Sequence, residues 1–340
     1  MADLSIQIEN QTGIITLTRP QALNALSFEM CAQIDSALHE WAENEQITQI
    51  IMRAEGEKSF CAGGDVAALY HLGKAGEIEQ INAFWRAEYK MNSFIAHYPK
   101  PIIAMMQGYV MGGGVGIGCH ASHRVIAEST RLAMPECAIG LIPDVGGSYL
   151  LARTNGHIGE YMALTGARIK PCDILETGFA DIHIPQSQWE QLQRDIIRTN
   201  DLNLLRDAGT PPEDQSQLQG QMDEINMLFG ASDHLAFSRQ LAQTDTPFAE
   251  QVRKSVTRGS PVSMASIFTL IREVRAANHI DAALDWEYRF TSRAIEQADF
   301  LEGVRAVLVD KDHNPSWQIK TIDEVSAEQI NALFAPASRH

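Results

Sequence analysis

The chain has 340 residues, of which 45% are hydrophobic and 21% are charged, so it can form one large or two medium globular domains. Its 27 basic and 43 acidic side chains give a net charge of −16. This excess of acid argues against nucleic acid as a partner, because phosphates need a basic face. No apolar run reaches the ~18 residues of a membrane span. We therefore expect no membrane association.

Cysteine usage and the first residues predict the compartment. The five cysteines show no CxxC spacing, which argues against a disulfide framework or structural zinc and favours a reducing environment. The N-terminal stretch lacks the basic start and apolar block of a signal peptide and the arginines of a transit peptide. We expect a cytoplasmic protein.

The first half of the chain alternates short β-type runs with helical patterns. Apolar residues recur at helical spacing after Ser27, a residue suited to cap a helix. The predicted strands are 13–18, 48–52, 101–106, 124–127 and 179–184. This alternation is typical of an α/β fold, in which the loops at strand ends are available for chemistry.

From about residue 186 onward the pattern is mainly helical. Ser260 followed by proline is a favourable helix start. Apolar periodicity runs through 217–229, 231–243, 262–277 and 281–297. The polar stretch 207–217, with paired prolines, predicts a linker. We therefore predict two domains, a core over 1–185 and a mainly helical region over 186–340.

Two glycine clusters follow predicted strands, SFCAGGD at 59–65 and MGGGVGIG at 111–118. Consecutive glycines let backbone N–H groups approach a ligand, and at a helix start those donors have no acceptor within the helix. One N–H from each loop could bind the same oxygen and form an oxyanion hole. Close packing of a helix against a strand is the other interpretation.

A nucleotide-binding function fits the second cluster poorly. The stretch 116–121 matches the GxGxxA form of the dinucleotide fingerprint, but Glu128 follows Gly116 by only 12 residues where about 20 are expected. A NAD-dependent dehydrogenase is therefore a remote alternative. P-loop, GxSxG and HExxH motifs do not occur in the sequence.

Two histidines and two cysteines near the second glycine cluster or beside the first could in principle bind metal or react. His120 and His123 could share a helix face. The sequence has no cluster of acidic ligands near them, so a metal site is not favoured. Cys61 and Cys119 lie beside the glycine clusters, where a small core residue is the more common role of a free cysteine.

The stretch 134–147, MPECAIGLIPDVGG, places Glu136 and Asp144 in an apolar context. Its prolines and glycines predict a folded loop or broken strand rather than a helix. A turn could bring both acids into one pocket, where apolar surroundings would raise at least one pKa and suit proton transfer. The alternative is that one acid caps a helix or pairs with Arg131 or Arg153.

These motifs together resemble the crotonase (enoyl-CoA hydratase/isomerase) superfamily, and within it most closely the 3-hydroxyisobutyryl-CoA hydrolase branch. The matching stretches are 17–30, 58–69, 105–118, 132–153 and 301–317. The resemblance implies a crotonase-like spiral of ββα units with a helical C-terminal region. Only about 185–250 lacks a recognisable signature.

The resemblance also assigns catalytic roles. It implies that the N–H groups of Gly64 and Gly113 form the oxyanion hole. It places the catalytic glutamate at Glu136 and the second catalytic acid at Asp144. The hydratases carry their second glutamate where this chain has Gly116, and glycine where it has Asp144. This displacement of the acid pair favours thioester hydrolysis over hydration.

The substrate implied by the resemblance is an acyl-CoA, so no metal or redox cofactor is expected and coenzyme A enters as part of the substrate. Glu88 matches a substrate-contacting glutamate of the hydrolase branch, and the loop containing Ala62, Asp65 and Val66 matches the backbone that holds the adenine end. Lys58, Arg53 and basic residues of the C-terminal region are candidate partners of the phosphates.

The expected reaction is therefore 3-hydroxyisobutyryl-CoA and water to 3-hydroxyisobutyrate and coenzyme A, a step of valine breakdown. An enoyl-CoA hydratase or isomerase on the same fold is the alternative. A non-catalytic acyl-CoA-binding protein is more remote. The superfamily often forms trimers, so a homo-oligomer is possible.

Overall fold

The computed structural model describes residues 2–336 and contains two compact units, each assembled from three separate segments of the chain. Unit 1 comprises 2–64, 87–132 and 169–216, and unit 2 comprises 65–86, 133–168 and 217–336. The last passage between the units lies at Ser216, inside the polar stretch predicted as a linker. These units are compact groups of segments and are not shown to fold independently. The two contiguous domains predicted over 1–185 and 186–340 therefore remain a prediction.

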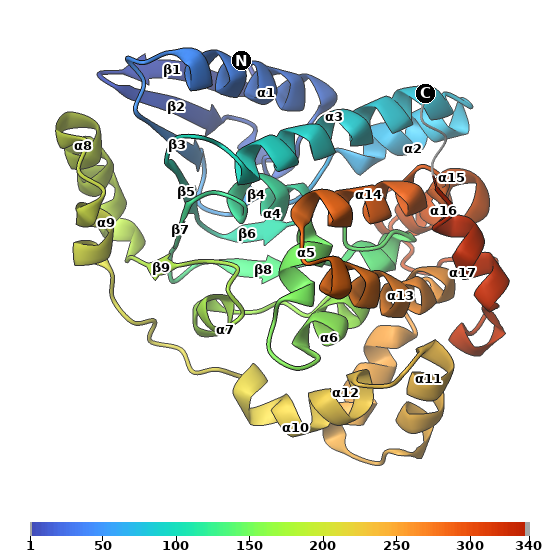
Figure 1. Cartoon of the computed structure of the whole chain (residues 1–340). Helices are drawn as coiled ribbons and strands as arrows, with labels where there is room; N and C mark the ends of the chain where they lie inside the picture. The colour runs from blue at the N-terminus through green and yellow to red at the C-terminus, as the bar shows by residue number, and fades with distance from the viewer. Residues whose placement is uncertain (1, 337–340) are drawn as a thin grey trace. The chain divides into compact units, whose positions relative to one another are not determined.

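A six-stranded sheet forms the centre of unit 1 (Figure 1). The strands of the chain are β1 (Leu4–Glu9), β2 (Thr12–Leu17), β3 (Gln49–Ala54), β4 (Ser59–Cys61), β5 (Ile102–Met106), β6 (Tyr109–Met111), β7 (His123–Ile126), β8 (Arg131–Ala133) and β9 (Ile182–His183). The large sheet has the order β1-β2-β3-β5-β7-β9, antiparallel between β1 and β2 and parallel elsewhere. A smaller sheet has the order β4-β6-β8.

Helices cover both faces of the large sheet. The helices of unit 1 are α1 (Phe28–Glu43), the second half of α3 (Ile78–Ala96), α4 (Gly113–Gly118), α7 (Pro171–Glu176), α8 (Trp189–Thr199) and α9 (Asn203–Ala208). Trp41 of α1 packs beside Ile50, whereas the neighbouring Ile51 packs with Trp189 of α8. Successive strand residues point to opposite faces, so α1 and α8 lie on opposite sides of the sheet.

Capping explains where the predicted helices begin. Ser27 accepts a hydrogen bond from the Met30 N–H at 3.2 Å and starts α1 as predicted. Ser260 accepts from the Ser263 N–H, and α13 begins at the following proline. The five predicted strands correspond to β2, β3, β5, β7 and β9, the last of which is shorter than predicted.

Unit 2 is mainly helical. Its helices are the first half of α3, α2 (Val66–Lys74), α5 (Gly147–Ala152), α6 (Ile158–Thr165), α10 (Leu218–Phe229), α11 (His234–Gln243), α12 (Pro247–Val256), α13 (Pro261–Ala277), α14 (Ile280–Thr291), α15 (Ala294–Gln297), α16 (Phe300–Val304) and α17 (Ala327–Leu333). The long helix α13 is buried along most of its length and contacts α5, α6 and α14. Within the described residues, every helix is too short or too polar to traverse a bilayer.

Candidate active site

The two glycine clusters lie against each other in unit 1. Gly64 forms a β-bridge with Leu26, whose N–H donates to the Gly63 carbonyl at 2.9 Å. Gly113 is the first residue of α4, and a Cβ built on it would stand 3.3 Å from the Gly63 carbonyl carbon. Within residues 2–336 neither the Gly64 nor the Gly113 N–H donates to a backbone acceptor. The structure therefore brings together the two amides that the resemblance assigns to the oxyanion hole.

Glu88 lies beside the same glycines. Its side chain comes from the second half of α3, is 2% exposed, and would have Oε1 2.7 Å from a Cβ on Gly113. Burial and then the negative charge of Glu88 raise the pKa of the Cys31 thiol. Glu88 is thus placed next to Gly113, as a residue that contacts the acyl group would require.

The neighbouring cysteines are poorly suited to nucleophilic chemistry. Burial raises the pKa of Cys61 to about 12, and burial likewise raises the pKa of Cys119 to about 12. A thiol with such a pKa stays protonated near neutrality, and the thiolate is the reactive form. The two residues are therefore small core residues, as the sequence favoured.

Other glycines of the second cluster serve close packing. A Cβ on Gly114 would stand 2.1 Å from the Cys61 carbonyl oxygen, and one on Gly118 would stand 2.5 Å from Met106 Sδ. Gly118 is the second glycine of the GxGxxA match, and it is packed against a core side chain. A pyrophosphate therefore has no room to approach it. Close packing therefore accounts for Gly114 and Gly118, and the role of Gly64 and Gly113 as an oxyanion hole remains a prediction.

The two predicted acids lie in unit 2, and both are buried. Glu136 begins a short 3-10 helix (Glu136–Ile139), which ends at Gly140 with φ 73°. Burial raises the pKa of Glu136 well above its usual value, and the charge of Asp144 raises it further. The raised pKa and the burial of both acids agree with the sequence, and their sharing of one pocket remains a prediction. Within the stretch predicted as a folded loop or broken strand, residues 136–139 form a 3-10 helix.

The two arginines considered as ion-pair partners make other contacts. Arg131 donates to the backbone carbonyls of Glu128 and Thr130. Arg153 donates to Asn278 Oδ1 and lies over the Tyr149 ring.

A further buried acid that acts on the pKa of Glu136, Glu287, was not predicted. This residue of α14 is fully buried and accepts hydrogen bonds from Gly146 N at 2.8 Å, from Ser148 N at 3.1 Å and from the Ser148 hydroxyl. Burial raises its pKa to about 8, although these hydrogen bonds favour the charged form. A signal was present, because Glu287 falls on the face of α14 that carries buried Leu284 and Phe290.

The loop predicted to bind the adenine end has a defined conformation. The Ala62 N–H donates to the Leu23 carbonyl at 3.1 Å. Asp65 caps α2 by accepting from Ala68 N at 3.3 Å, and Val66 is the first residue of that helix. These contacts fix the backbone of the loop, and its role in binding coenzyme A remains a prediction.

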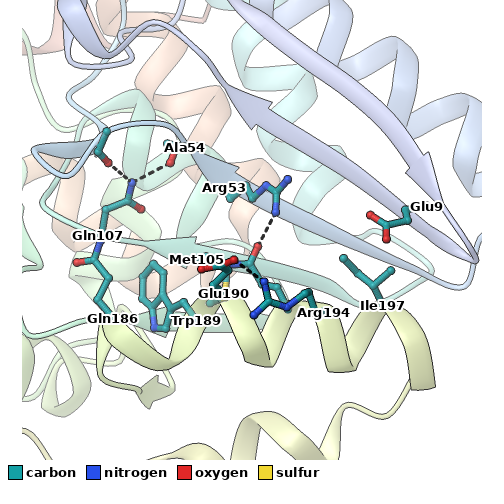
Figure 2. Close-up of a pocket in the computed structure, with 12 residues that line it drawn as sticks. Glu9, Arg53, Ala54, Met105, Gln107, Gln186, Trp189, Glu190, Arg194 and Ile197 are labelled. Atoms are coloured by element: carbon teal, nitrogen blue, oxygen red, sulfur yellow. Dashed lines mark hydrogen bonds and ion pairs between the residues drawn. The ribbon is translucent and has the colours of Figure 1, made fainter.

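The two candidate phosphate partners occupy different cavities of unit 1. Arg53 lines a cavity of about 430 Å³ between the large sheet and α8 (Figure 2). Its guanidinium group donates to Thr16 Oγ1 and Gln193 Oε1. Arg53 shares the sheet face of Ile51, whereas α4 packs on Met106 of the opposite face. Lys58 lines a separate cavity of about 330 Å³. Arg53 therefore faces away from α4, whereas Lys58 and the basic residues of the C-terminal region remain candidates for the phosphates.

Comparison with known proteins places the chain in a family. The profile of the enoyl-CoA hydratase/isomerase family matches residues 12–334. The chain belongs to this family, the crotonase superfamily. Curated relatives include the mitochondrial 3-hydroxyisobutyryl-CoA hydrolase of Gallus gallus, 38% identical over 98% of this chain and 89% of the relative. The Homo sapiens protein of the same name is 36% identical over 95% and 86%.

Solved structures share the fold over nearly the whole chain. An enoyl-CoA hydratase from Rhodobacter sphaeroides 2.4.1 is 44% identical, with a TM-score of 0.93 and 98% of both chains covered. A carnitinyl-CoA dehydratase from Mycobacterium thermoresistibile is 34% identical, with a TM-score of 0.94, covering 99% of this chain and 98% of that one. The α/β fold with mixed sheets and a helical C-terminal region is that of the crotonases.

Proposed function

We propose that this crotonase-family protein hydrolyses the thioester of 3-hydroxyisobutyryl-CoA to 3-hydroxyisobutyrate and free coenzyme A. The observation that carries the proposal is the buried pair Glu136 and Asp144, in which Asp144 helps raise the pKa of Glu136. An acid with a pKa moved toward neutrality is suited to proton transfer at physiological pH. The full-length similarity to curated 3-hydroxyisobutyryl-CoA hydrolases supports the same reaction.

In the proposed reaction the N–H groups of Gly64 and Gly113 donate to the thioester carbonyl oxygen. Attack on the carbonyl carbon turns this oxygen into an oxyanion, and losing one such donor typically costs about 10²–10³ in rate. The tetrahedral intermediate collapses by breaking the C–S bond, and coenzyme A leaves as a thiol after taking up a proton. Glu88 recognises the 3-hydroxyl group.

Glu136 has two possible roles in this scheme, with Asp144 orienting the attacking group or the substrate hydroxyl. As a general base, Glu136 removes a proton from water as the water attacks. As a nucleophile, it forms a mixed anhydride that water then hydrolyses. A single turnover in H₂¹⁸O separates the two, because only the anhydride route can transfer ¹⁸O into the Glu136 carboxylate.

The test is a thiol-release assay across acyl-CoA substrates, with branched or straight chains and with or without a 3-hydroxyl. We expect the fastest release from 3-hydroxyisobutyryl-CoA. Glu136→Gln should lower kcat by about 10²–10⁴ with the fold retained. Glu160→Gln is the matched control, since Glu160 is buried in unit 2 but pairs with Arg275. Full activity of Glu136→Gln would refute the proposal.

Hydration of an enoyl-CoA is the second candidate, favoured by the solved hydratase that is 44% identical to this chain. The same samples incubated with crotonyl-CoA report hydration as loss of double-bond absorbance. Hydration without thiol release would replace the hydrolase proposal.

We further propose a cytoplasmic location, although the curated hydrolases are mitochondrial. Support comes from the five cysteines, all of which are free thiols.

A further inference from the structure

The turn after Asp144 has an unfavourable backbone conformation. Val145 has φ 56° and Gly146 has φ 76°, so two successive residues are left-handed. Glycine accepts this conformation, but a β-branched residue such as valine rarely does. Such a turn persists only when its surroundings hold it, and residues of this kind cluster at functional sites.

Glu287 is the group that holds this turn. Its carboxylate receives Gly146 N on Oε2 and both the N–H and hydroxyl of Ser148 on Oε1. Both oxygens are therefore used, and they connect α14 to the two sides of Gly147. A single carboxylate thus fixes the backbone that immediately follows Asp144.

An acidic side chain is costly at this position. Glu287 forms no ion pair with a lysine, arginine or histidine within residues 2–336, and the negative charge of Asp144 adds to the effect of burial on its pKa. A well-packed apolar side chain would avoid the desolvation of a buried acid. Only an acceptor with two oxygens, however, can receive all three donors of the turn.

We propose that Glu287 is a positioning residue of the acid site, which acts by fixing the turn 145–148 and so the orientation of Asp144. This inference rests on the proposed hydrolase function. Glu287 thereby joins the acid site from a helix 143 positions further along the chain than Asp144.

The experiment compares Glu287→Gln, Ser148→Ala and the double variant with the wild-type chain. Glutamine keeps the volume, but its NH₂ group must face a donor of the turn. We expect kcat for thiol release to fall by about 10–100-fold with KM within about twofold, because small displacements of catalytic groups cost up to about 10²-fold. Ser148→Ala removes one of three bonds and should cost less.

Two further measurements separate positioning from general destabilisation. Amide hydrogen exchange at 145–148 should accelerate in both single variants and remain unchanged in Glu160→Gln, which should also keep wild-type kcat. The loss in the double variant should differ from the sum of the two single losses, because Glu287 and the Ser148 hydroxyl belong to one hydrogen-bonded turn.

Several outcomes would overturn the inference. The first is a wild-type kcat in Glu287→Gln, and the second is an equal loss of kcat in Glu160→Gln. The third is a double variant whose loss of kcat equals the combined losses of the two single variants. If Glu287→Gln fails to fold, Ser148→Ala decides, and wild-type kcat with unchanged exchange in that variant overturns the proposal. A wild-type chain that releases no thiol refutes the hydrolase function itself, which is a result distinct from an active enzyme indifferent to Glu287.

Discussion

Single residues show why this chain places acids in its interior. Glu136 is 5% exposed and Asp144 is 6% exposed, and each is preceded by a proline. The pKa of Glu136 rises first because burial penalises its charged form, and second because Asp144 is negative. Two acids held this way cost folding free energy, and what they provide is a carboxyl group whose pKa is raised above its usual range, as a proton-transfer group requires.

A change at Asp144 should move the pH dependence of the reaction. Asp144→Asn keeps the volume and removes the charge that raises the pKa of Glu136. The pKa of Glu136 then falls, so Glu136 is deprotonated at lower pH. If Glu136 acts in its charged form, the acid limb of kcat/KM moves to lower pH, on a residual rate reduced by about 10²-fold or more.

The measurement is thiol release between pH 5 and pH 9 for Asp144→Asn and the wild-type chain. Glu160→Gln again serves as the control, because Glu160 pairs with Arg275 and does not contribute to the raised pKa of Glu136. An acid limb that stays at the wild-type pH would show that Asp144 does not control the ionisation of Glu136.

At the scale of elements, α4 shows how tightly a glycine-rich segment can pack. This six-residue helix is entirely buried, and a Cβ on Gly114 would overlap the backbone of β4 at the Cys61 carbonyl. Backbone atoms cannot rotate away as a side chain can. The segment therefore has glycine at 114, where it meets β4, and at 118, where it meets Met106.

Gly114→Ala should consequently destabilise unit 1. A Cβ 2.1 Å from a carbonyl oxygen forces the helix to move, and overpacking of this kind costs about 1–3 kcal/mol or more. Gly220→Ala is the matched control, because Gly220 lies in α10 with no atom within 4 Å of its built Cβ. That change should stabilise the chain by ~0.5–1 kcal/mol. Urea unfolding measures both, and equal effects would contradict the packing argument.

The elements also show which parts of the fold the sequence could predict. Runs of four to six apolar residues predicted β2, β3, β5 and β7 close to their observed bounds. The strands β4, β6 and β8 have three residues each, too few for alternation to be recognised. The caps Ser27 and Ser260 were predictable because each accepts its capping hydrogen bond from an N–H in the first turn of its own helix.

For the whole molecule, prediction fails where distant segments meet. Glu136 and Asp144 could be paired because they are eight positions apart in a turn-forming stretch. Glu287 could not, because its partners lie about 140 positions earlier and no local pattern connects a helix residue to that turn. The interleaved segments of the two units have the same origin, since chain order does not specify which segments pack together.

The stability of the whole chain should carry the signature of its buried acids. The pKa of Glu287 is raised from 4.5 to about 8, and that of Glu136 is raised in the same direction. Between about pH 6.5 and 8 the unfolded chain has lost the Glu287 proton while the folded chain still retains much of it. Linkage then requires the free energy of unfolding to fall as pH rises toward 8, by at most ~1.4 kcal/mol per pH unit for each proton retained.

Comparison with Glu287→Gln isolates the contribution of the Glu287 proton. The variant cannot titrate at this position, so its free energy of unfolding should depend less steeply on pH between 6.5 and 8. The lowered pKa of His123 acts mainly below this window and the raised pKa values of the buried cysteines act above it, and both are common to the two proteins. Urea unfolding at intervals across the window gives the slopes. Parallel slopes would mean that Glu287 is already ionised in the folded chain, with the three donors of the turn outweighing its burial.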